Sequence, residues 1–340
     1  NNAPFKAYLK ITKVDRETGK VVPYAGAGFE IYDSNGKKVL QTFTYPKKTT
    51  ISTYYTNADG YLITPEKLDY GKNYTLVEVQ APYGYVLDST PIKFNVTREN
   101  SEIEDALTLI KVKRDNIAQK GIIEVTKSGE VFASVENTDN IYTPVYEVQN
   151  LKGAVYQVFA AENIKTPDGT IRYQQGEQVD EITTGNDGIA KTKQLYLGKY
   201  TVVEKTAPVN FVNANQQYDV ELVYAGQNIA VTSTALSVYN ERQKVTTSLS
   251  KVMQTDETYK LGMNDEILSV QFGIYAAEDV QATDGSVIPA DDLITIANCD
   301  KDGNITFDCD LPIGFKWYAK EIATDEHYIL SDEQHFFDTE

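Results

Sequence analysis

The stretch Tyr200–Pro208, which reads YTVVEKTAP, occurs three times in related form along the chain. Its counterparts are YTLVEVQAP at Tyr74–Pro82 and WYAKEIATD at Trp317–Asp325. Each copy follows an Asp-Gly pair set among alternating polar and apolar residues, as in GNDGIAKT at residues 185–192. Asp-Gly adopts the φ > 0 turn that matches strand twist, so this pattern predicts a β-hairpin. The recurrence predicts tandem copies of one domain.

Upstream of each copy lies a strand-like segment that ends in lysine: LKITK at Lys13, IIEVTK at Lys127 and TSLSK at Lys251. Short polar links near residues 118 and 243 separate the copies. Thr, Val, Ile and 24 Tyr favour strands, and helical periodicity is lacking. The sequence therefore predicts an all-β protein of three tandem antiparallel β-sandwich domains, spanning residues 1–118, 119–242 and 243–340.

The charge and composition exclude several classes of partner. The 340 residues include 49 acidic and 32 basic side chains, for a net charge of −17. Nucleic acids and anionic membranes need a basic face, so neither is an expected partner. No apolar run reaches membrane-spanning length, and no secretion signal is visible. We interpret the sequence as a fragment of a longer protein and expect a monomer without a cofactor.

Two cysteines, Cys299 and Cys309, are the only ones in the chain. They allow a single disulfide across a hairpin or two free thiols, because sequence does not fix their geometry. A secreted protein of this length without a disulfide framework needs another source of stability.

The lysine of each repeat extends an apolar row on one face of its strand. Side chains alternate faces along a strand, so Lys13 shares a face with Leu9 and Ile11. By the same parity Lys127 and Lys251 face inward. Two glutamates do so as well, since Glu204 continues the row of Tyr200 and Val202, and Glu321 the row of Trp317 and Ala319. For Glu78 the alternate face is equally apolar, and parity does not decide.

A third residue type recurs at a matching distance. Asn240 lies 36 residues after Glu204 and 11 before Lys251, and Asn116 lies 38 after Glu78 and 11 before Lys127. Arg114 on the inward face of the same segment suggests a bulge there. Asp115 is then the alternative acceptor in the first domain.

These three residue types can form an amide between side chains. Burial lowers the pKa of an amine, which leaves it neutral and nucleophilic. A buried carboxyl group can polarise a carboxamide and move the proton. The amine attacks the carboxamide carbon and ammonia leaves, once per molecule. The alternative is a plain Lys–Glu ion pair at a strand end, but three repeats with the same inward pair favour the cross-link. Closing about 100 residues stabilises a fold by roughly 4 to 5 kcal/mol in the loop-entropy model.

The chain resembles the Cna B-type, prealbumin-like (SpaA-like) repeats of Gram-positive adhesins and sortase-assembled pilins. The first domain carries the resemblance in KVDRETGKVVPYAGAGFEIYDSNGK (13–37) and NADGYLITPEKLDYGKNYTLVEVQAPYGYVLD (57–88). In that family a lysine, a glutamate and a last-strand Asn or Asp form an isopeptide bond. The resemblance implies cross-links Lys13–Asn116 and Lys127–Asn240, with Glu78 and Glu204 as proton shuttles.

Two departures from the family pattern are visible. The second domain reads TKSG in place of TKVD and carries an insert, Glu130–Gln149, expected to decorate one end. In the third domain an acceptor 36 residues after Glu321 falls near position 357, beyond the sequence given. We therefore expect this domain to lack its last strand, with Lys251 and Glu321 unpaired by an acceptor.

The predicted function is that of a stalk or spacer in a cell-wall-anchored, extracellular adhesin of a Gram-positive surface. A host matrix protein or glycan is expected to bind regions outside this fragment, and peptidoglycan to be joined through a sortase signal absent from it. A pilus subunit is the second hypothesis, for which Tyr45-Pro46-Lys47 is a weak polymerisation motif. The third is a matrix- or glycan-binding module acting through Glu130–Gln149 or Thr42–Tyr55. We expect no enzymatic activity beyond the autocatalytic formation of the isopeptide bonds. We also expect no metal site, since the two histidines, His327 and His335, lack a ligand cluster.

Overall fold

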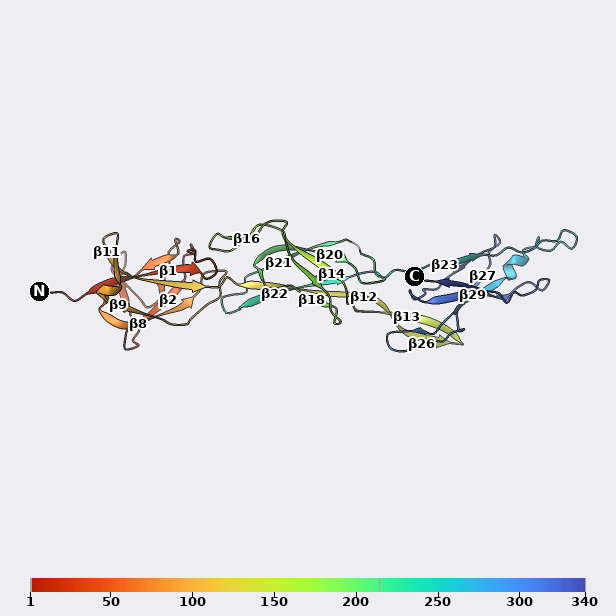
Figure 1. The fold of residues 1–340 in the computed structure, drawn as a ribbon, viewed down its shortest axis with the longest axis horizontal. Helices are drawn as coiled ribbons and strands as arrows, with labels where there is room; N and C mark the ends of the chain where they lie inside the picture. The colour runs from red at the N-terminus through yellow and green to blue at the C-terminus, as the bar shows by residue number, and fades with distance from the viewer. Residues whose placement is uncertain (1, 214, 340) are drawn as a thin grey trace.

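The computed structural model describes residues 2–213 and 215–339. Strands account for nearly all of its regular structure, and the described helices are two short 3₁₀ turns, Arg98–Asn100 and Glu266–Ser269. Three consecutive groups of strands follow one another along an extended rod, with the N-terminus at one end (Figure 1). The predicted all-β class is confirmed.

The first strand group, residues 6–116, consists of two sheets around one core. One sheet has the order β10-β11-β1-β6, with β7 also pairing with β1, and the other has the order β5-β2-β8-β9. Buried apolar side chains from both sheets, among them Leu9, Phe29 and Leu76, fill the space between them. The strands are β1 Lys6–Asp15, β2 Gly28–Tyr32, β5 Tyr54–Tyr55, β6 Tyr61–Ile63, β7 Leu68–Asp69, β8 Gly71–Gln80, β9 Ile92–Val96, β10 Ser101–Glu104 and β11 Leu107–Asn116.

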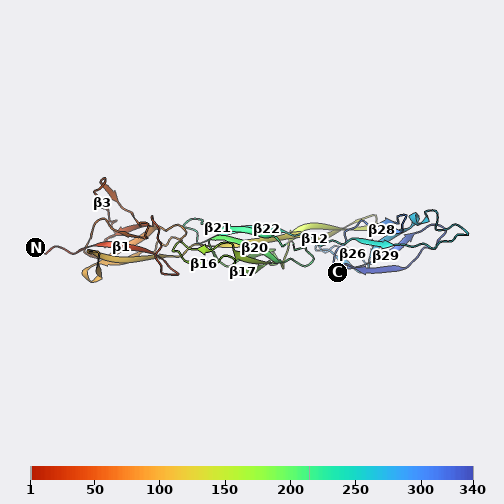
Figure 2. The same cartoon turned by 90° about the horizontal axis from the view of Figure 1, so that it is seen from above.

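A hairpin, β3 (Gln41–Phe43) and β4 (Thr49–Ile51), projects sideways from the first strand group (Figure 2). Tyr45 near its tip is 86 % exposed. The hairpin belongs to neither main sheet, and its tip stands clear of the core, whereas Ile51 and Tyr54 at the end of the segment Thr42–Tyr55 pack in or against it.

The first and last strands of the first group run parallel, which the prediction of purely antiparallel sandwiches missed. β1 pairs with β11 in a parallel register from Tyr8–Leu109 to Asp15–Asn116. The chain reaches β11 from β9 in the opposite sheet through the short hairpin with β10. After this crossing the chain runs along β11 in the same direction as along β1. The ends of the first and last strands therefore lie side by side.

The second strand group, residues 120–240, repeats this arrangement. β12 pairs in parallel with β22, from Lys120–Val231 to Ser128–Tyr239, and antiparallel with β18 and β19. The facing sheet has the order β17-β14-β20-β21, and a small β15–β16 ribbon lies beside it. The strands are β12 Lys120–Thr138, β14 Val155–Ala160, β15 Ile164–Lys165, β16 Ile171–Tyr173, β17 Gln178–Thr183, β18 Ile189–Lys191, β19 Leu195–Tyr196, β20 Gly198–Thr206, β21 Gln217–Leu222 and β22 Val231–Tyr239.

The insert Glu130–Gln149 is a structural bridge rather than a decoration. β12 runs past Lys127 and forms a long hairpin with β13 (Ile141–Asn150), and β13 pairs with β27 of the third group at Ile141–Leu293. Phe132 and Tyr142 pack against the third group's core. The expectation that the insert decorates one end was wrong, because Phe132, Val135 and Tyr142 pack against the core of the neighbouring strand group.

Gly129 explains the departure TKSG in the second repeat. A Cβ atom at this position would lie 2.5 Å from the Phe211 ring and 2.8 Å from the Asn240 carbonyl oxygen. Asp15 holds the corresponding place in the first group, two residues after the lysine. Only glycine lets β12 pass straight between these neighbours on its way into the hairpin.

The third strand group, residues 247–338, is built around Trp317 and Ile274. β24, β27, β29 and β30 form one sheet, which β13 extends, while β23 pairs only with β28 among the described residues. Among the described residues, no strand pairs in parallel with β23. The strands are β23 Thr247–Ser250, β24 Gln271–Ala276, β25 Val280–Gln281, β26 Val287–Ile288, β27 Leu293–Asn298, β28 Asn304–Phe307, β29 Lys316–Ala323 and β30 Gln334–Asp338.

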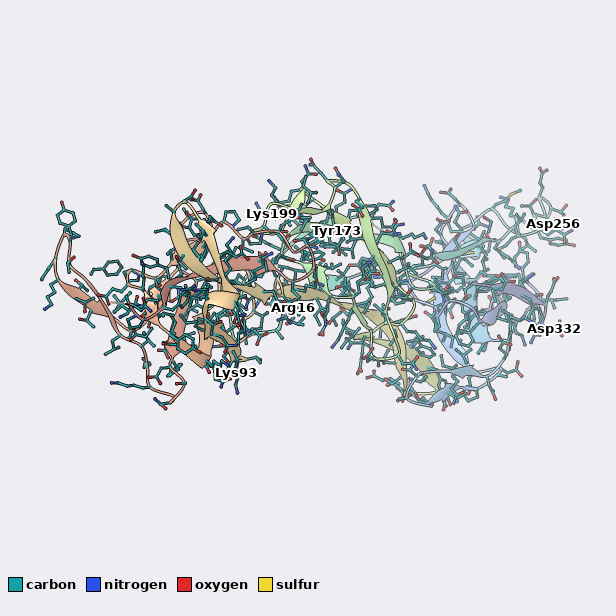
Figure 3. All side chains as sticks on the ribbon, turned by 60° about the vertical axis from the view of Figure 1, so that its left-hand side comes forward. Arg16, Lys93, Tyr173, Lys199, Asp256 and Asp332 are labelled. Atoms are coloured by element: carbon teal, nitrogen blue, oxygen red, sulfur yellow. The ribbon has the colours of Figure 1, made fainter. Side chains whose placement is uncertain are left out.

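Figure 3 shows Arg16 where the first and second strand groups meet, and Asp256 and Asp332 toward the far end of the third group. Neither of the short helices in residues 2–213 and 215–339 has the length and apolar character needed to cross a bilayer.

Candidate cross-linking sites

The first site joins the two sheets of the first strand group. Lys13 ends the inward row of β1, and Glu78 continues the inward row of Tyr74 and Leu76 on β8. Lys13 Nζ lies 2.9 Å from Glu78 Oε1, and both side chains are fully buried. The structure thus places Glu78 on the core face, which parity alone left open.

Asn116 at the end of β11 completes this site. Its Nδ2 donates to Glu78 Oε2 at 2.7 Å and to the Val86 carbonyl oxygen at 2.6 Å. The backbone N–H of Asp88 also donates to Glu78 Oε2, at 3.2 Å. The Glu78 carboxylate therefore lies between the lysine amine and the carboxamide nitrogen, with one oxygen facing each.

Neither the expected bulge at Arg114 nor the alternative acceptor Asp115 fits the structure. The parallel register of β1 and β11 is continuous through Lys13–Arg114 and Asp15–Asn116. Arg114 is buried and pairs with Asp88. Because Asp88 neutralises the guanidinium inside the fold, no bulge is needed to turn this side chain outward. Asp115 points outward and pairs with Arg16, so it lies away from Lys13 on the opposite face of the strand.

The second site has the same geometry. Lys127 Nζ lies 2.9 Å from Glu204 Oε1, and Asn240 Nδ2 donates to Glu204 Oε2 at 2.8 Å. The Lys127 and Glu204 side chains are 0 % and 3 % exposed. The two repeats thus bring the same three groups into the same contacts.

Burial changes the acid–base behaviour of both lysines. It lowers the pKa of Lys13 from 10.5 to about 8, against the opposing effect of the Glu78 carboxylate. Burial likewise lowers the pKa of Lys127, opposed by the hydrogen bond with Glu204. A larger fraction of each amine is therefore neutral, and able to act as a nucleophile, than in an exposed lysine.

This arrangement can carry out one acyl transfer. The carboxylate oxygen beside Nζ can take a proton from the lysine, and the other oxygen lies beside the nitrogen that must leave as ammonia. Attack of Nζ on the carboxamide carbon forms the new C–N bond, and the old C–N bond breaks as the proton reaches Nδ2. The reaction written in this way needs no metal or cofactor.

Tyr156 is a member of the second site that the sequence analysis missed. It lies on β14 opposite Glu204 on β20, and its ring centre is 5.9 Å from Lys127 Nζ. Its buried hydroxyl has no hydrogen-bond partner among the described residues. Phe29 and Phe272 hold the same position opposite Glu78 and Glu321. A comparison of the three repeats at this position would have revealed the difference.

The third site has two of the three groups. Lys251 Nζ lies 2.9 Å from Glu321 Oε1, with the lysine side chain 25 % exposed. Glu321 Oε2 accepts from the backbone N–H of Ser331 at 2.9 Å. No carboxamide side chain among the described residues contacts this pair.

Among the described residues, neither cysteine and neither histidine hydrogen-bonds the lysine or the glutamate of these sites. Cys299 and Cys309 are both free, so the possible disulfide is not formed. In the turn after β27, the backbone N–H of Asp300 donates to the Asn304 carbonyl oxygen. The residues that face Cys299 across this turn therefore come before Cys309 in the chain. Among the described residues, the His327 side chain hydrogen-bonds Asp325. The described residues contain no cluster of three His, Cys, Asp or Glu that could hold a metal ion.

In the first two strand groups, paired sheets whose first and last strands run parallel enclose a buried Lys–Glu–Asn set. The chain belongs to the SpaA prealbumin-like fold domain family, whose model matches residues 7–111 and 145–235. The resemblance seen in the sequence is thereby confirmed.

Several solved structures are similar to this chain, and the first of them shares its fold. The Bacillus anthracis TIE protein is 22 % identical with a TM-score of 0.57, and the match covers 99 % of this chain and 48 % of that one, so this chain spans about half its length. The Streptococcal ancillary pilin is 20 % identical, TM-score 0.28, over 72 % of this chain and 64 % of its own. BcpA, the major pilin subunit of Bacillus cereus, is 16 % identical with a TM-score of 0.33, and the match covers 97 % of this chain and 94 % of BcpA. A search of curated protein sequences found no significant match.

Proposed function

We propose that this chain is a load-bearing stalk of a Gram-positive cell-surface adhesin, made of three tandem prealbumin-like domains at residues 1–118, 119–242 and 243–340. Isopeptide bonds Lys13–Asn116 and Lys127–Asn240 stabilise the first two domains. The observation that carries the proposal is the buried carboxylate of Glu78, and again of Glu204, bridging a lysine Nζ and an asparagine Nδ2 between the first and last strands.

The position of these bonds suits a protein under tension. The first domain is entered at β1 and left at β11, and the proposed bond lies near the exit ends of both strands. A pulling force would pass along β1, through the bond and out of the domain. The roughly 100 residues between Lys13 and Asn116 would carry no load.

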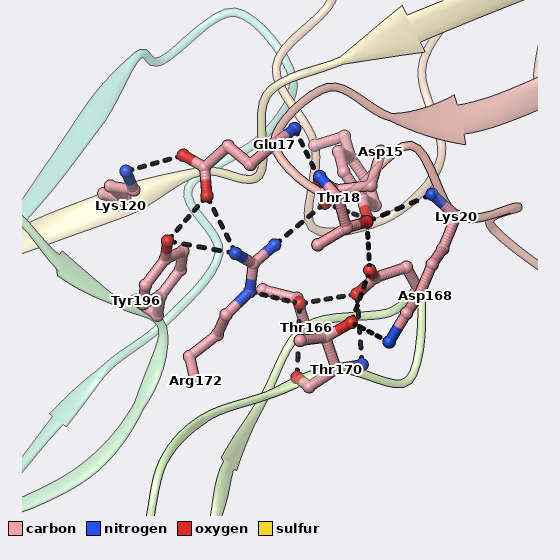
Figure 4. Close-up of polar contacts among 11 residues, drawn as sticks. Asp15, Glu17, Thr18, Lys20, Lys120, Thr166, Asp168, Thr170, Arg172 and Tyr196 are labelled. Carbon is pink, nitrogen blue, oxygen red and sulfur yellow. Dashed lines mark hydrogen bonds and ion pairs between the residues drawn. The ribbon is translucent and has the colours of Figure 1, made fainter.

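The joint between the first two domains supports a stiff rod. Arg172 donates to Glu17 at 3.0 Å and to the buried Asp15 at 3.3 Å. Lys120 pairs with Glu17, and Thr18 donates to Asp168 at 2.7 Å (Figure 4). Only residues 117–119 separate β11 from β12, which leaves little chain for a hinge.

The second joint is held by the bridging hairpin and by Arg242. Its guanidinium carbon lies 3.6 Å from the Tyr146 ring centre, and the same group pairs with Asp310 and with Glu130. Because the insert Glu130–Gln149 is used in this joint, it is a poor candidate for a ligand-binding surface.

A pilus subunit is the alternative function, favoured by one observation. Lys47 follows Tyr45-Pro46 in the loop of the projecting β3–β4 hairpin, where it is exposed. An intermolecular bond at this lysine in material from the native cell surface would favour the pilus subunit over the stalk.

Stretching single molecules between their two ends tests the stalk proposal. With both bonds in place, the first two domains should add almost no length at forces that extend the third. Lys13→Arg and Lys127→Arg keep the positive charge but cannot form the amide, so each variant should release one domain's length. Extension of all three domains in the unaltered chain would refute the proposal.

A further inference from the structure

A loop of the second domain covers the loop that completes the first cross-linking site. The covered loop, residues 81–91, joins β8 to β9, and the covering loop, residues 223–230, joins β21 to β22. A Cβ atom on Gly84 would lie 3.0 Å from Pro167 Cγ of the second domain. The Tyr83 and Tyr224 rings also meet across this contact, with their centres 4.6 Å apart. The β8–β9 loop is therefore packed directly against the neighbouring domain.

The inner side of the β8–β9 loop takes part in the site itself. The Val86 carbonyl oxygen accepts from Asn116 Nδ2 at 2.6 Å, and the Asp88 N–H donates to Glu78 Oε2 at 3.2 Å. Nδ2 uses its second N–H on Glu78 Oε2, whereas Asn116 Oδ1 has no hydrogen-bond partner among the described residues. A carboxamide turned by half a rotation would set Oδ1 against two oxygen atoms. The Val86 carbonyl thus helps to fix the orientation in which Lys13 meets the carboxamide.

The outer side of the same loop is held by the second domain. The Gln227 carbonyl oxygen accepts from the Leu87 N–H at 2.9 Å, and the Gln227 side-chain oxygen accepts from the Ala81 N–H at 2.8 Å. The Tyr224 hydroxyl donates to the Tyr85 carbonyl oxygen at 2.9 Å. Three hydrogen bonds from the second domain therefore hold the backbone of the β8–β9 loop.

One peptide group connects the two sides of this loop. The Val86 carbonyl and the Leu87 N–H belong to the same planar unit. Its carbonyl holds the Asn116 carboxamide, and its N–H is held by Gln227. Because the unit is planar and rigid, a shift of the β21–β22 loop also moves the Val86 carbonyl. Consecutive hydrogen bonds of this kind also polarise and strengthen one another.

Gln119, the residue before β12, fixes the β21–β22 loop within the second domain. Its buried side chain donates to the carbonyl oxygens of Gly226 and Ile229 and accepts from the Ala225 N–H. The position of the covering loop is thus set by the fold of the second domain rather than by its contact with the first.

The second cross-linking site lacks a matching support from the third domain. Val212 follows Glu204 by eight residues, as Val86 follows Glu78. Asn240 Nδ2, however, hydrogen-bonds only Glu204 among the described residues. The neighbouring segment 209–211 faces the third domain across a cavity of about 170 Å³. The two sites therefore differ in how far they depend on the next domain.

We propose that the second domain positions the reacting carboxamide of the first, so that the Lys13–Asn116 bond forms at its full rate only after the second domain has folded. Gln227 and Tyr224 are positioning residues, since they touch the β8–β9 loop and not the reacting atoms. The inference rests on the bond chemistry proposed above, in which Lys13 Nζ bonds to the Asn116 carboxamide carbon and ammonia leaves. What it adds is an order of events, because the first domain completes its bond after the second has folded.

The rates of the two bonds in the full chain, made by cell-free synthesis, test this proposal. Samples quenched in acid at successive times are digested, and mass spectrometry measures the Lys13–Asn116 and Lys127–Asn240 cross-linked peptides. Tyr224→Phe combined with Gln227→Ala removes two of the three hydrogen bonds to the β8–β9 loop. The Lys13–Asn116 bond should then form roughly tenfold more slowly, since misplacing a reacting group by about 1 Å can cost a hundredfold. The Lys127–Asn240 bond should keep its rate.

Two further variants and one further measurement control the experiment. Asn228→Ala changes an exposed neighbour in the same loop and should leave both rates unaltered. Gln227→Glu keeps a side-chain oxygen for the Ala81 N–H and should also form the Lys13–Asn116 bond at the unaltered rate. Hydrogen exchange of the β1 and β11 amides reports when the first domain has folded, which should occur at the same time in every variant.

The outcomes separate this inference from the proposed function. An unaltered Lys13–Asn116 rate in the double variant would overturn the inference, as would equal slowing of both bonds or a delay explained by slower folding of the first domain. In each of these cases both bonds still form in the unaltered chain, and the proposed function stands. Absence of both bonds from the unaltered chain would refute the proposed function, and the inference with it.

Discussion

Among the described residues, the first two strand groups and the third differ in one strand beside the same lysine and glutamate. In the closed domains Lys13 and Lys127 are fully buried, and an asparagine lies on the far side of the carboxylate. In the third domain Lys251 is 25 % exposed and the carboxylate has no asparagine among the described residues. The last strand therefore both excludes water from the amine and brings the acyl group.

The largest expected effect of this difference is on stability. The third domain should unfold first, at a free energy about 5 kcal/mol or more below that of its sisters, because a closure of about 100 residues alone is worth roughly 4 to 5 kcal/mol. Trp317 fluorescence follows the third domain in urea, and segment-resolved hydrogen exchange follows the other two. Unfolding of all three domains at the same urea concentration would contradict the expected difference in stability between the third domain and the other two.

Removal of one acceptor should make a closed domain resemble the open one. Asn240→Ala keeps the contact between Lys127 and Glu204 but cannot form the bond, so the second domain should lose about 4 to 5 kcal/mol. Denaturant unfolding and intact mass measure the two consequences together. Asn213→Ala is a matched control, because among the described residues this asparagine hydrogen-bonds only backbone groups, those of Glu204, Lys205 and Asn215; it should leave the mass pattern of bond formation intact.

The lowered pKa of Lys13 predicts a pH dependence in a first domain that cannot form its bond. Burial lowers the pKa of Lys13 from 10.5 to about 8, and we expect Asn116→Ala to keep this shift, since Lys13 and Glu78 are unchanged. Between these values the unfolded chain binds the proton and the folded chain does not, so the free energy of unfolding rises with pH across this window, by on the order of 3 kcal/mol.

Urea unfolding at a series of pH values measures this rise. Adding Lys13→Met to Asn116→Ala should remove it, since the titrating amine is gone. A slope that is unchanged in the double variant would show that other groups cause the pH dependence.

The smallest effect is expected at the residue that distinguishes the two closed sites. Tyr156→Phe removes a buried hydroxyl without a partner and should be neutral or stabilising by up to about 1 kcal/mol, with the bond still formed. Phe29→Tyr, the reverse change in the first domain, should cost about 1 to 3 kcal/mol. Loss of the second bond in Tyr156→Phe would instead give the hydroxyl a part in the reaction.

The sequence was sufficient wherever the signal is local and periodic. Alternation placed Lys13, Lys127 and Glu204 on inward faces, and equal spacing identified Asn116 and Asn240, because strand geometry has a fixed period of two. Parity was silent for Glu78, since Val77 and Val79 make the other face of β8 apolar too.

The features that sequence reasoning missed depend on contacts between distant segments. The bulge expected at Arg114 is unnecessary because Asp88 neutralises it from another loop. Likewise, the insert Glu130–Gln149 reads as an isolated hairpin until β27 of the next domain pairs with it. Neither Asp88 nor β27 can be recognised as a contact partner from its spacing or its residue types in the sequence.

The central claim is that the closed domains carry a covalent bond and the open one does not. The intact mass of the unaltered chain tests this directly. The account predicts a mass lower than the sequence value by two ammonia molecules, with one restored in Asn116→Ala and one in Asn240→Ala. A mass equal to the sequence value would contradict it.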